Sequence, residues 1–267
     1  MVQQLIPARA DEAGTELTDE QILSLYDPGP GPLVRFNFVC SADGAATTSG
    51  RSGGLGTAAD QRLFALLRRP ADVILVGAGT IRAEGYAGEL IDDRARAWRG
   101  KRGMPAHPGI AVVSGSIDLD PESAFFAEAP VPVVVFTTAA ADPGRRRALE
   151  RVADVVTAGD ADVEPLQVIA RLAERGHLRV HSEGGPSLFA AFQRADALDS
   201  LCLSISPVLA GGAGMRIASG FASDLRPVDL TLLLEDEGAL FAEYRRQRPG
   251  QAAASANAPG GASRGSA

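Results

Sequence analysis

Short apolar runs alternate with segments of helical periodicity along most of this chain. Five of these runs predict buried strands, because they are brief, rich in β-branched side chains and bounded by turn residues. They lie at residues 34–40, 73–76, 110–113, 133–136 and 178–181. Such continuous apolar runs are typical of strands that are covered on both faces.

Two segments between these runs have the spacing of amphipathic helices. Residues 57–69 bring three leucines onto one face, begin at Thr57, which can cap a helix, and end before Pro70. Residues 163–175 have a similar apolar face and end before Gly176, a residue that favours the left-handed backbone found after helices.

The alternation predicts an α/β fold with a mainly parallel central sheet and helices on both faces. Further runs at residues 201–205 and 240–244 predict strands at an antiparallel edge, separated by a glycine-rich loop at 211–214. In sheets of this kind, ligands bind outside the carboxyl ends of the strands. We therefore expect a site in the loops that follow the predicted strands.

The two ends of the chain differ in composition from its centre. Residues 1–32 contain one amphipathic stretch and then the proline and glycine run at 27–32, which predicts an N-terminal extension. Residues 247–267 are almost entirely small or polar and predict a disordered tail. The compact domain is therefore predicted at residues 33–246.

Composition and charge narrow the classes of function. The net charge of −7 gives no basic footprint for nucleic acid, and no apolar run approaches the roughly 20 residues of a membrane span. The N-terminus lacks the pattern of a secretory signal, so we expect a cytoplasmic protein without a membrane partner. Cys40 and Cys202 lie in apolar runs and predict buried free thiols, and no spacing predicts a metal site.

Three predicted loops at strand ends carry the candidate chemistry. The first contains Asp43, and this segment alone favours a simple Asp-Gly turn over a ligand loop. The second, at residues 76–80, and the third, at 181–187, each pass through glycines into the start of a helix, where backbone N–H groups can bind a phosphate. Two such loops in one sheet favour a dinucleotide. Arg82 stands where a Rossmann fingerprint needs its third glycine, so that fold is disfavoured.

Six short motifs, taken in order, resemble the reductase domain of the riboflavin-pathway deaminase-reductases. They are Ser41-Ala-Asp-Gly44, Ser49-Gly-Arg-Ser52, Leu67-Arg68, Val76-Gly-Ala-Gly-Thr80, Glu183-Gly-Gly-Pro-Ser-Leu188 and Pro207-Val-Leu-Ala-Gly-Gly212. The resemblance implies a dihydrofolate-reductase-like fold, NADPH as cofactor and a homodimer. It also implies hydride transfer to a ribosylamino-pyrimidine phosphate as a small-molecule substrate.

The same resemblance assigns roles to individual residues. It implies cofactor contacts at Thr47, Gly79, Thr80, Glu84, Gly184, Gly185, Pro186, Ser187, Leu188 and Phe189. It implies substrate contacts at Ser52, Arg68 and Glu183 and makes Asp43 the candidate proton donor. Arg82, Arg94 and Arg96 are alternatives for a contact with the 2′-phosphate of NADPH.

Two departures from the family pattern leave alternatives open. Gly54 stands where the family commonly has a tryptophan, and residues 83–91 lack an arginine that would help to hold the substrate phosphate. A dihydrofolate or pterin reductase on the same fold, or a non-catalytic nucleotide-binding module, therefore remains an alternative. The zinc deaminase half of the bifunctional enzymes is not expected, because the chain has no Pro-Cys-x-x-Cys pair.

Overall fold

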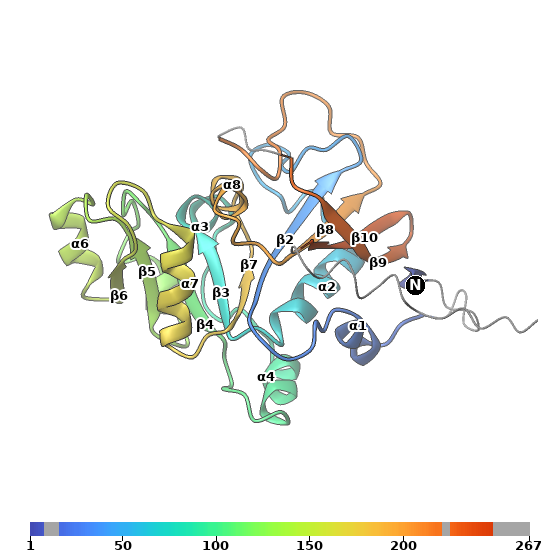
Figure 1. Ribbon diagram of the computed structural model, residues 1–267, viewed down its shortest axis with the longest axis horizontal. Coiled ribbons are helices and arrows are strands. Elements are labelled where there is room, and N and C mark those ends of the chain that lie inside the picture. The colour runs from blue at the N-terminus through green and yellow to red at the C-terminus, as the bar shows by residue number, and fades with distance from the viewer. Residues whose placement is uncertain (8–15, 221–224, 248–267) are drawn as a thin grey trace, which may run out of the picture.

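The computed structural model describes residues 1–7, 16–220 and 225–247 (Figure 1). The predicted tail lies outside this part of the chain, apart from Gln247. The strands are β1 (Gln3–Ile6), β2 (Leu33–Ser41), β3 (Val73–Gly77), β4 (Gly109–Val113), β5 (Val133–Thr137), β6 (Ala153–Thr157), β7 (Arg179–Ser182), β8 (Ser200–Ser206), β9 (Val228–Asp236) and β10 (Ala239–Arg246). The helices are α1 (Asp19–Leu25), α2 (Ala58–Arg68), α3 (Ala78–Glu84), α4 (Asp93–Gly100), α5 (Ala124–Ala127), α6 (Pro143–Leu149), α7 (Pro165–Glu174) and α8 (Pro186–Arg194).

One sheet contains all of these strands, in the order β1-β9-β10-β8-β2-β7-β3-β4-β5-β6. Every pair from β8 to β6 in this order is parallel, and the pairs that join β1, β9, β10 and β8 are antiparallel. The predicted α/β class, mainly parallel with an antiparallel edge, is confirmed. None of the helices in the described part of the chain is long and apolar enough to cross a membrane.

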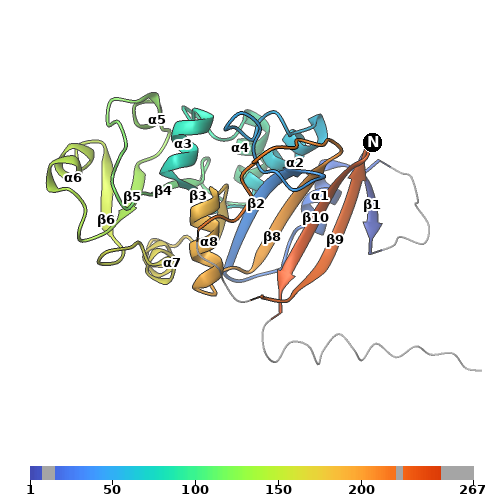
Figure 2. The same ribbon diagram turned by 90° about the horizontal axis from the view of Figure 1, so that it is seen from above.

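Helices cover both faces of the parallel strands, as expected (Figure 2). On β3, Val73 and Leu75 pack in the cluster that contains α7 and α8, whereas Ile74 and Val76 pack in the cluster that contains α3 and α5. Successive side chains of a strand point to opposite faces, so a run that is buried on both faces must be apolar throughout. This explains why the strand was visible in the sequence.

The predicted helix boundaries reflect local hydrogen bonding. The Thr57 hydroxyl accepts a hydrogen bond from the Asp60 amide at 3.1 Å and caps α2, which ends before Pro70. Gly176, after α7, has a φ of +81°, the left-handed backbone that favours glycine. Cys40 and Cys202 are buried free thiols, as predicted.

The first 32 residues contribute two elements to this architecture. β1 pairs with β9 at the end of the sheet, and α1 begins at a capping box formed by Thr18 and Gln21. Ile22 and Tyr26 share a buried cluster with α2 and with strands β8, β9 and β10. The described part of this segment therefore helps to cover the antiparallel half of the sheet, although the predicted boundary at residue 33 stays a prediction.

Candidate active site

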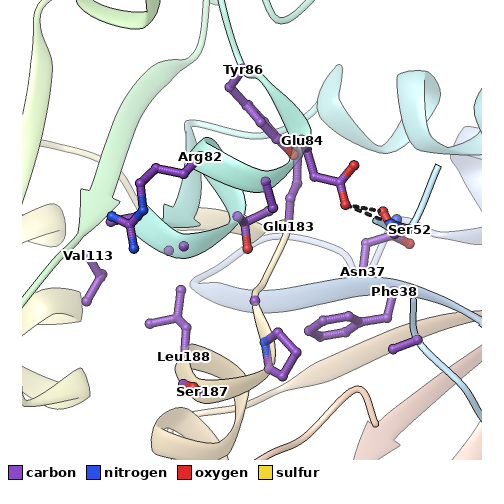
Figure 3. A pocket seen from close by; sticks show the side chains of 18 of the residues that line it. Asn37, Phe38, Ser52, Arg82, Glu84, Tyr86, Val113, Glu183, Ser187 and Leu188 are labelled. Carbon is purple, nitrogen blue, oxygen red and sulfur yellow. Dashed lines mark hydrogen bonds between the residues drawn. The ribbon is translucent and has the colours of Figure 1, made fainter. Parts of the chain in front are cut away.

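A cavity of about 1050 Å³ lies beyond the carboxyl ends of β2, β3 and β7. Arg82 and Glu84 of α3 lie across from Ser187 and Leu188 of α8 (Figure 3), and residues of α2 also line the cavity. This is where a parallel sheet is expected to bind ligands. The volume lies at the upper end of the range of about 300–1,000 Å³ that is typical of small-molecule sites, and suits two ligands held side by side.

The two predicted glycine loops pack directly against each other at one wall. The Gly77 amide donates a hydrogen bond to the Gly184 carbonyl at 2.7 Å, and the Glu183 amide donates one to the Leu75 carbonyl at 3.0 Å. A Cβ at Gly185 would lie 2.6 Å from the Thr80 hydroxyl, and one at Gly184 would lie 2.7 Å from the Phe38 ring. The wall is therefore backbone, packed too closely for any side chain at either position.

The start of α8 continues this wall. Pro186 occupies the first turn of the helix, and Ser187 and Leu188 follow it along the cavity. The first N–H groups of a helix have no partner within the helix and attract anions. Because Pro186 has no N–H, the donors available in this turn come from the residues on either side of it. This arrangement suits a diphosphate.

Glu84, at the end of α3, closes the loop that follows β2. Its carboxylate accepts hydrogen bonds from the Ser52 amide at 2.8 Å and from the Ser52 hydroxyl at 2.9 Å (Figure 3). The contact joins residues 32 positions apart in the sequence. In this structure Glu84 therefore holds Ser52 in place, although the resemblance implied that the two residues contact different ligands.

A second wall, which begins at Glu183 directly before the glycine loop, is built around a buried ion pair. The Arg68 guanidinium donates to both Glu183 carboxylate oxygens, at 2.5 and 2.8 Å, and to the Leu90 carbonyl at 2.6 Å. The Tyr86 hydroxyl donates to the same carboxylate at 2.6 Å. The Glu183 side chain is only 1% exposed and that of Arg68 14%. Bidentate pairs of this kind are strong and fix both side chains.

Charge and burial set the protonation of this network. Burial alone would raise the pKa of Glu183, but the positive charge and hydrogen bonds of Arg68, together with the Tyr86 hydroxyl, lower it. Burial raises the pKa of Tyr86 well above its ordinary value, and the nearby Glu183 charge adds to this effect. At neutral pH the wall therefore presents a carboxylate and a neutral phenol.

The structure brings together most of the residues that the sequence suggested. Those that line the cavity are Thr47, Ser52, Arg68, Gly79, Thr80, Glu84, Glu183, Gly185, Pro186, Ser187 and Leu188. Gly184 and Phe189 are not among the lining residues. Gly184 turns its backbone towards Gly77, and Phe189 packs against the rings of Phe36 and Phe38 beneath the wall.

Asp43 lies apart from this cavity. Its exposed carboxylate accepts hydrogen bonds from the Ser41 hydroxyl and from the backbone amides of Ala210, at 3.1 Å, and Gly211, at 2.7 Å. These bonds lower the pKa of Asp43 to about 2, so the group is ionised at neutral pH. In this structure Asp43 joins two loops, and it is neither placed nor protonated to act as the expected proton donor.

Two side chains of the ion-pair wall were missed by the sequence analysis. Phe64 lies one helical turn before Arg68, whose guanidinium sits 4.3 Å from the Phe64 ring centroid. The spacing of four residues on a predicted helix was a signal that could have found it. Tyr86 falls in the segment that departs from the family pattern, where no motif pointed to it.

Among the arginines proposed for a 2′-phosphate, Arg82 lines the cavity, whereas Arg96 pairs with Glu89 and Asp93.

Comparison with known proteins gives a consistent result. The model of the RibD C-terminal domain family matches residues 32–236. The chain is 29% identical to a 2,5-diamino-6-ribosylamino-4(3H)-pyrimidinone 5′-phosphate reductase of Methanothermobacter thermautotrophicus, over 69% of this chain and 82% of that protein. It is 28% identical to the riboflavin biosynthesis protein RibD of Mycobacterium tuberculosis, over 68% of this chain but only 44% of that longer protein.

A solved structure extends the likeness to three dimensions. The pyrimidine reductase-like protein of Corynebacterium diphtheriae superposes with a TM-score of 0.77 at 27% identity, covering 87% of this chain and the whole of that one. The resemblance inferred from the six motifs is thus confirmed. The chain belongs to the RibD C-terminal domain family.

Proposed function

We propose that this protein is an NADPH-dependent reductase of a ribosylamino-pyrimidine 5′-phosphate. The observation that carries the proposal is one cavity with two unlike walls, one of close-packed glycine backbone and one of a buried ion pair. The first suits a dinucleotide and the second a polar heterocycle. The name of the archaeal relative supplies the substrate class.

The glycine wall passes a test of fit for the cofactor. No atom lies within 4 Å of where a Cβ would stand at Gly79, so the cavity is open in front of this backbone. Gly185 and Ser187 would hold the diphosphate with the start of α8, and Thr80 would add a hydroxyl. Phe38 and Leu188 would supply apolar surface beside the cofactor (Figure 3). When bound, NADPH would supply the hydride.

Preference for the phosphorylated cofactor would come from Arg82. This side chain lines the cavity and donates to the Asp118 carbonyl, which holds it close to the loop at Ser114–Ser116. Arginine pairs well with phosphate because its planar fork matches the oxygens. Neither Arg94 nor Arg96 is among the residues that line the cavity, so we assign the 2′-phosphate contact to Arg82.

The ion-pair wall would orient the substrate. Ser52, fixed by Glu84, and the Arg68–Glu183 pair present donors and a carboxylate to one end of the cavity. Hydride addition also consumes one proton. Glu183 is ionised and Tyr86 is a very weak acid, so neither is suited to deliver it at neutral pH. We assign positioning roles to both residues and take water in the cavity as the proton source.

A homodimer would be formed through the antiparallel half of the sheet. Val228 and Leu230, two residues apart on the same face of β9, expose large apolar side chains there. Exposed apolar residues that gather on one region mark interaction surfaces. Light scattering on the purified protein should give twice the mass of the chain, and Leu230→Glu should reduce that mass. A monomeric wild-type protein would rule this out.

The enzymatic proposal is tested by following NADPH oxidation with the ribosylamino-pyrimidine phosphate and, in parallel, with dihydrofolate. We expect turnover of the pyrimidine, with a product heavier by two hydrogens in mass spectrometry, and none of dihydrofolate. Turnover of dihydrofolate alone would reassign the substrate within the same fold. NADPH that binds but is oxidised with neither compound would replace the enzyme with a nucleotide-binding module.

A further inference from the structure

A second cavity, of about 530 Å³, lies at the opposite end of the parallel strands. It is lined by residues of α1, α4 and the end of α2 and by the first residues of β2 and β7. Its apolar walls include Leu23, Leu67 and the half-buried Trp98. The volume falls within the range of about 300–1,000 Å³ of small-molecule sites. The proposed reaction makes no use of it.

Three of its lining residues bury polar atoms that have no hydrogen-bond partner in the described part of the chain. They are the Tyr26 hydroxyl, the Nε of Arg35 and both ring nitrogens of His181. The Trp98 Nε1 is a fourth such group in the same wall. Each unpartnered buried polar group costs about 1–3 kcal/mol, so several of them beside one cavity require an explanation.

These polar atoms are closed to solvent in this structure, so a ligand bonds to them once their side chains turn towards the cavity. Their chemistry defines that ligand. Tyr26, Arg35 and Trp98 can each donate a hydrogen bond, and burial lowers the pKa of His181 to about 4, so that its imidazole is neutral and offers one donor and one acceptor. Donors therefore exceed acceptors. A molecule rich in acceptors would match them.

The charges around the cavity balance. Its acidic residues are Glu20, Asp27 and Asp72, and its basic residues are Arg35, Arg102 and Arg179. Arg102 pairs with Glu20, Arg179 with Asp27, and Arg35 with the buried Glu243. Asp72 instead accepts hydrogen bonds from the backbone amides of Leu178 and Arg179, each at 2.8 Å. Because each of these charged groups is already engaged, the cavity favours an uncharged ligand; a net charge would lose its hydration without gaining a partner.

Shape adds a further restriction. The Arg102 guanidinium lies 3.8 Å from the Trp98 ring centroid and stacks on it, so one wall is a flat surface formed by an aromatic ring and a planar cation. Flat heteroaromatic rings bind such surfaces by stacking. We propose that the second cavity binds an uncharged, planar heteroaromatic molecule rich in hydrogen-bond acceptors, and that its occupancy is transmitted to the active site through His181.

The transmission would run along β7. His181 and Glu183 are two residues apart, so their side chains point to the same face of the sheet. His181 lines the second cavity, Glu183 lines the first, and the His181 Nε2 lies 4.0 Å from a Glu183 carboxylate oxygen. A ligand that fixes the imidazole proton or moves its ring changes the field at Glu183. On α2, Leu67 lines the second cavity and its neighbour Arg68 lines the first, so this helix also connects the two.

Trp98 allows a direct test, because it is the only tryptophan in the chain. We would titrate the protein with lumichrome, an uncharged planar tricycle, in saturating NADPH and follow tryptophan fluorescence. Ser24, exposed on α1 at the rim of the cavity, is changed to Phe to block the entrance and to Ala as the matched control. We expect saturable quenching in the wild-type protein and in Ser24→Ala. In Ser24→Phe binding should weaken at least about tenfold, which corresponds to about 1.4 kcal/mol.

Quenching that is absent, or equal in Ser24→Phe and Ser24→Ala, would overturn the proposed binding site.

The coupling between the two cavities is tested separately and rests on the proposed reductase activity. Saturating lumichrome should change kcat or KM for the pyrimidine in Ser24→Ala and leave both unchanged in Ser24→Phe. Binding without any change in kcat or KM would overturn the coupling alone. A protein without reductase activity would leave the fluorescence test intact.

Discussion

The two walls of the main cavity are built by different means. The glycine wall, which we propose as the cofactor wall, consists of backbone from two loops, each following a parallel strand, and it depends on glycines at Gly77, Gly184 and Gly185. The ion-pair wall, which we propose as the substrate wall, consists of side chains from α2, from the loop after α3 and from the end of β7, held together by the Arg68–Glu183 pair. Backbone contacts suit a ligand that all members of a family share, whereas side chains can change without disturbing the sheet.

The largest effect is expected from removing one partner of the ion pair. Arg68→Ala would leave the buried Glu183 carboxylate without its cation, and such a loss costs about 3–5 kcal/mol in the free energy of unfolding. Unfolding in denaturant measures this loss of stability. The double change Arg68→Met with Glu183→Leu should recover most of the stability and none of the activity. A single variant as stable as the wild type would show that the pair is not buried in solution.

Tyr86→Phe separates the substrate wall from the cofactor wall. It removes a hydrogen bond to a charged group, typically worth about 1.5–3 kcal/mol, while Arg68 keeps Glu183 in place. We expect KM for the pyrimidine to rise at least about tenfold and KM for NADPH to stay the same. Tyr244→Phe, on β10, is the matched control and should change neither. An equal rise in both constants would contradict the division into two walls.

Gly184→Ala tests the cofactor wall. The residue has a φ of +85°, and a methyl group would meet the Phe38 ring at 2.7 Å. Such strain costs about 1–3 kcal/mol, and we expect weaker NADPH binding in a fluorescence titration. Gly100→Ala, in α4 with open space around it, should not weaken binding. Unchanged affinity in Gly184→Ala would mean that the loop does not contact the cofactor.

Arg82→Ala should lower the preference for NADPH over NADH by about tenfold in kcat/KM, or about 1.4 kcal/mol, by removing one partner of the 2′-phosphate. Arg145 is the control. It reaches Asp118 as Arg82 does, but it is not among the residues that line the cavity. An equal loss in Arg145→Ala would point to a general effect of charge.

The smallest effect is expected from pH. The pKa values of Glu183 and His181 are lowered and that of Tyr86 is raised, so none of the three titrates near neutrality. We expect kcat/KM to be flat between about pH 6 and 8. The stability that the ionised Glu183 contributes is present above its unfolded pKa of about 4.3 and is lost as pH falls through its lower folded value. A bell-shaped profile centred on pH 7 would require another acid.

The elements and walls made of regular backbone were easier to predict from the sequence than the contacts between side chains. The strands covered on both faces, such as β3, were visible as apolar runs, and the glycine loops were found because backbone walls require glycine at fixed positions. β9 and β6 were not predicted. Neither strand is buried along its length, and their apolar residues are mixed with polar ones. β8, predicted at the edge, lies inside the sheet, because β10 and β9 pair beyond it.

The side-chain wall could be predicted only in part. Arg68 and Glu183 were named separately, but their pairing joins residues 115 positions apart, and nothing in the sequence indicates it. Asp43 was suggested as a proton donor because the family resemblance implied an acidic loop residue there, whereas the structure uses it to hold the amides of Ala210 and Gly211. The second cavity was also invisible, since it forms where α1, α2 and α4 meet.

The position of β1 has a practical consequence for shortening the protein. This strand covers the otherwise open side of β9, and α1 covers apolar side chains of α2 and β9. A protein that began at Leu33 would expose a row of unpaired N–H and C=O groups beside an uncovered apolar layer. Exposed edges of this kind pair with other chains. Such a truncated protein would aggregate, even though every residue of its active site would be intact.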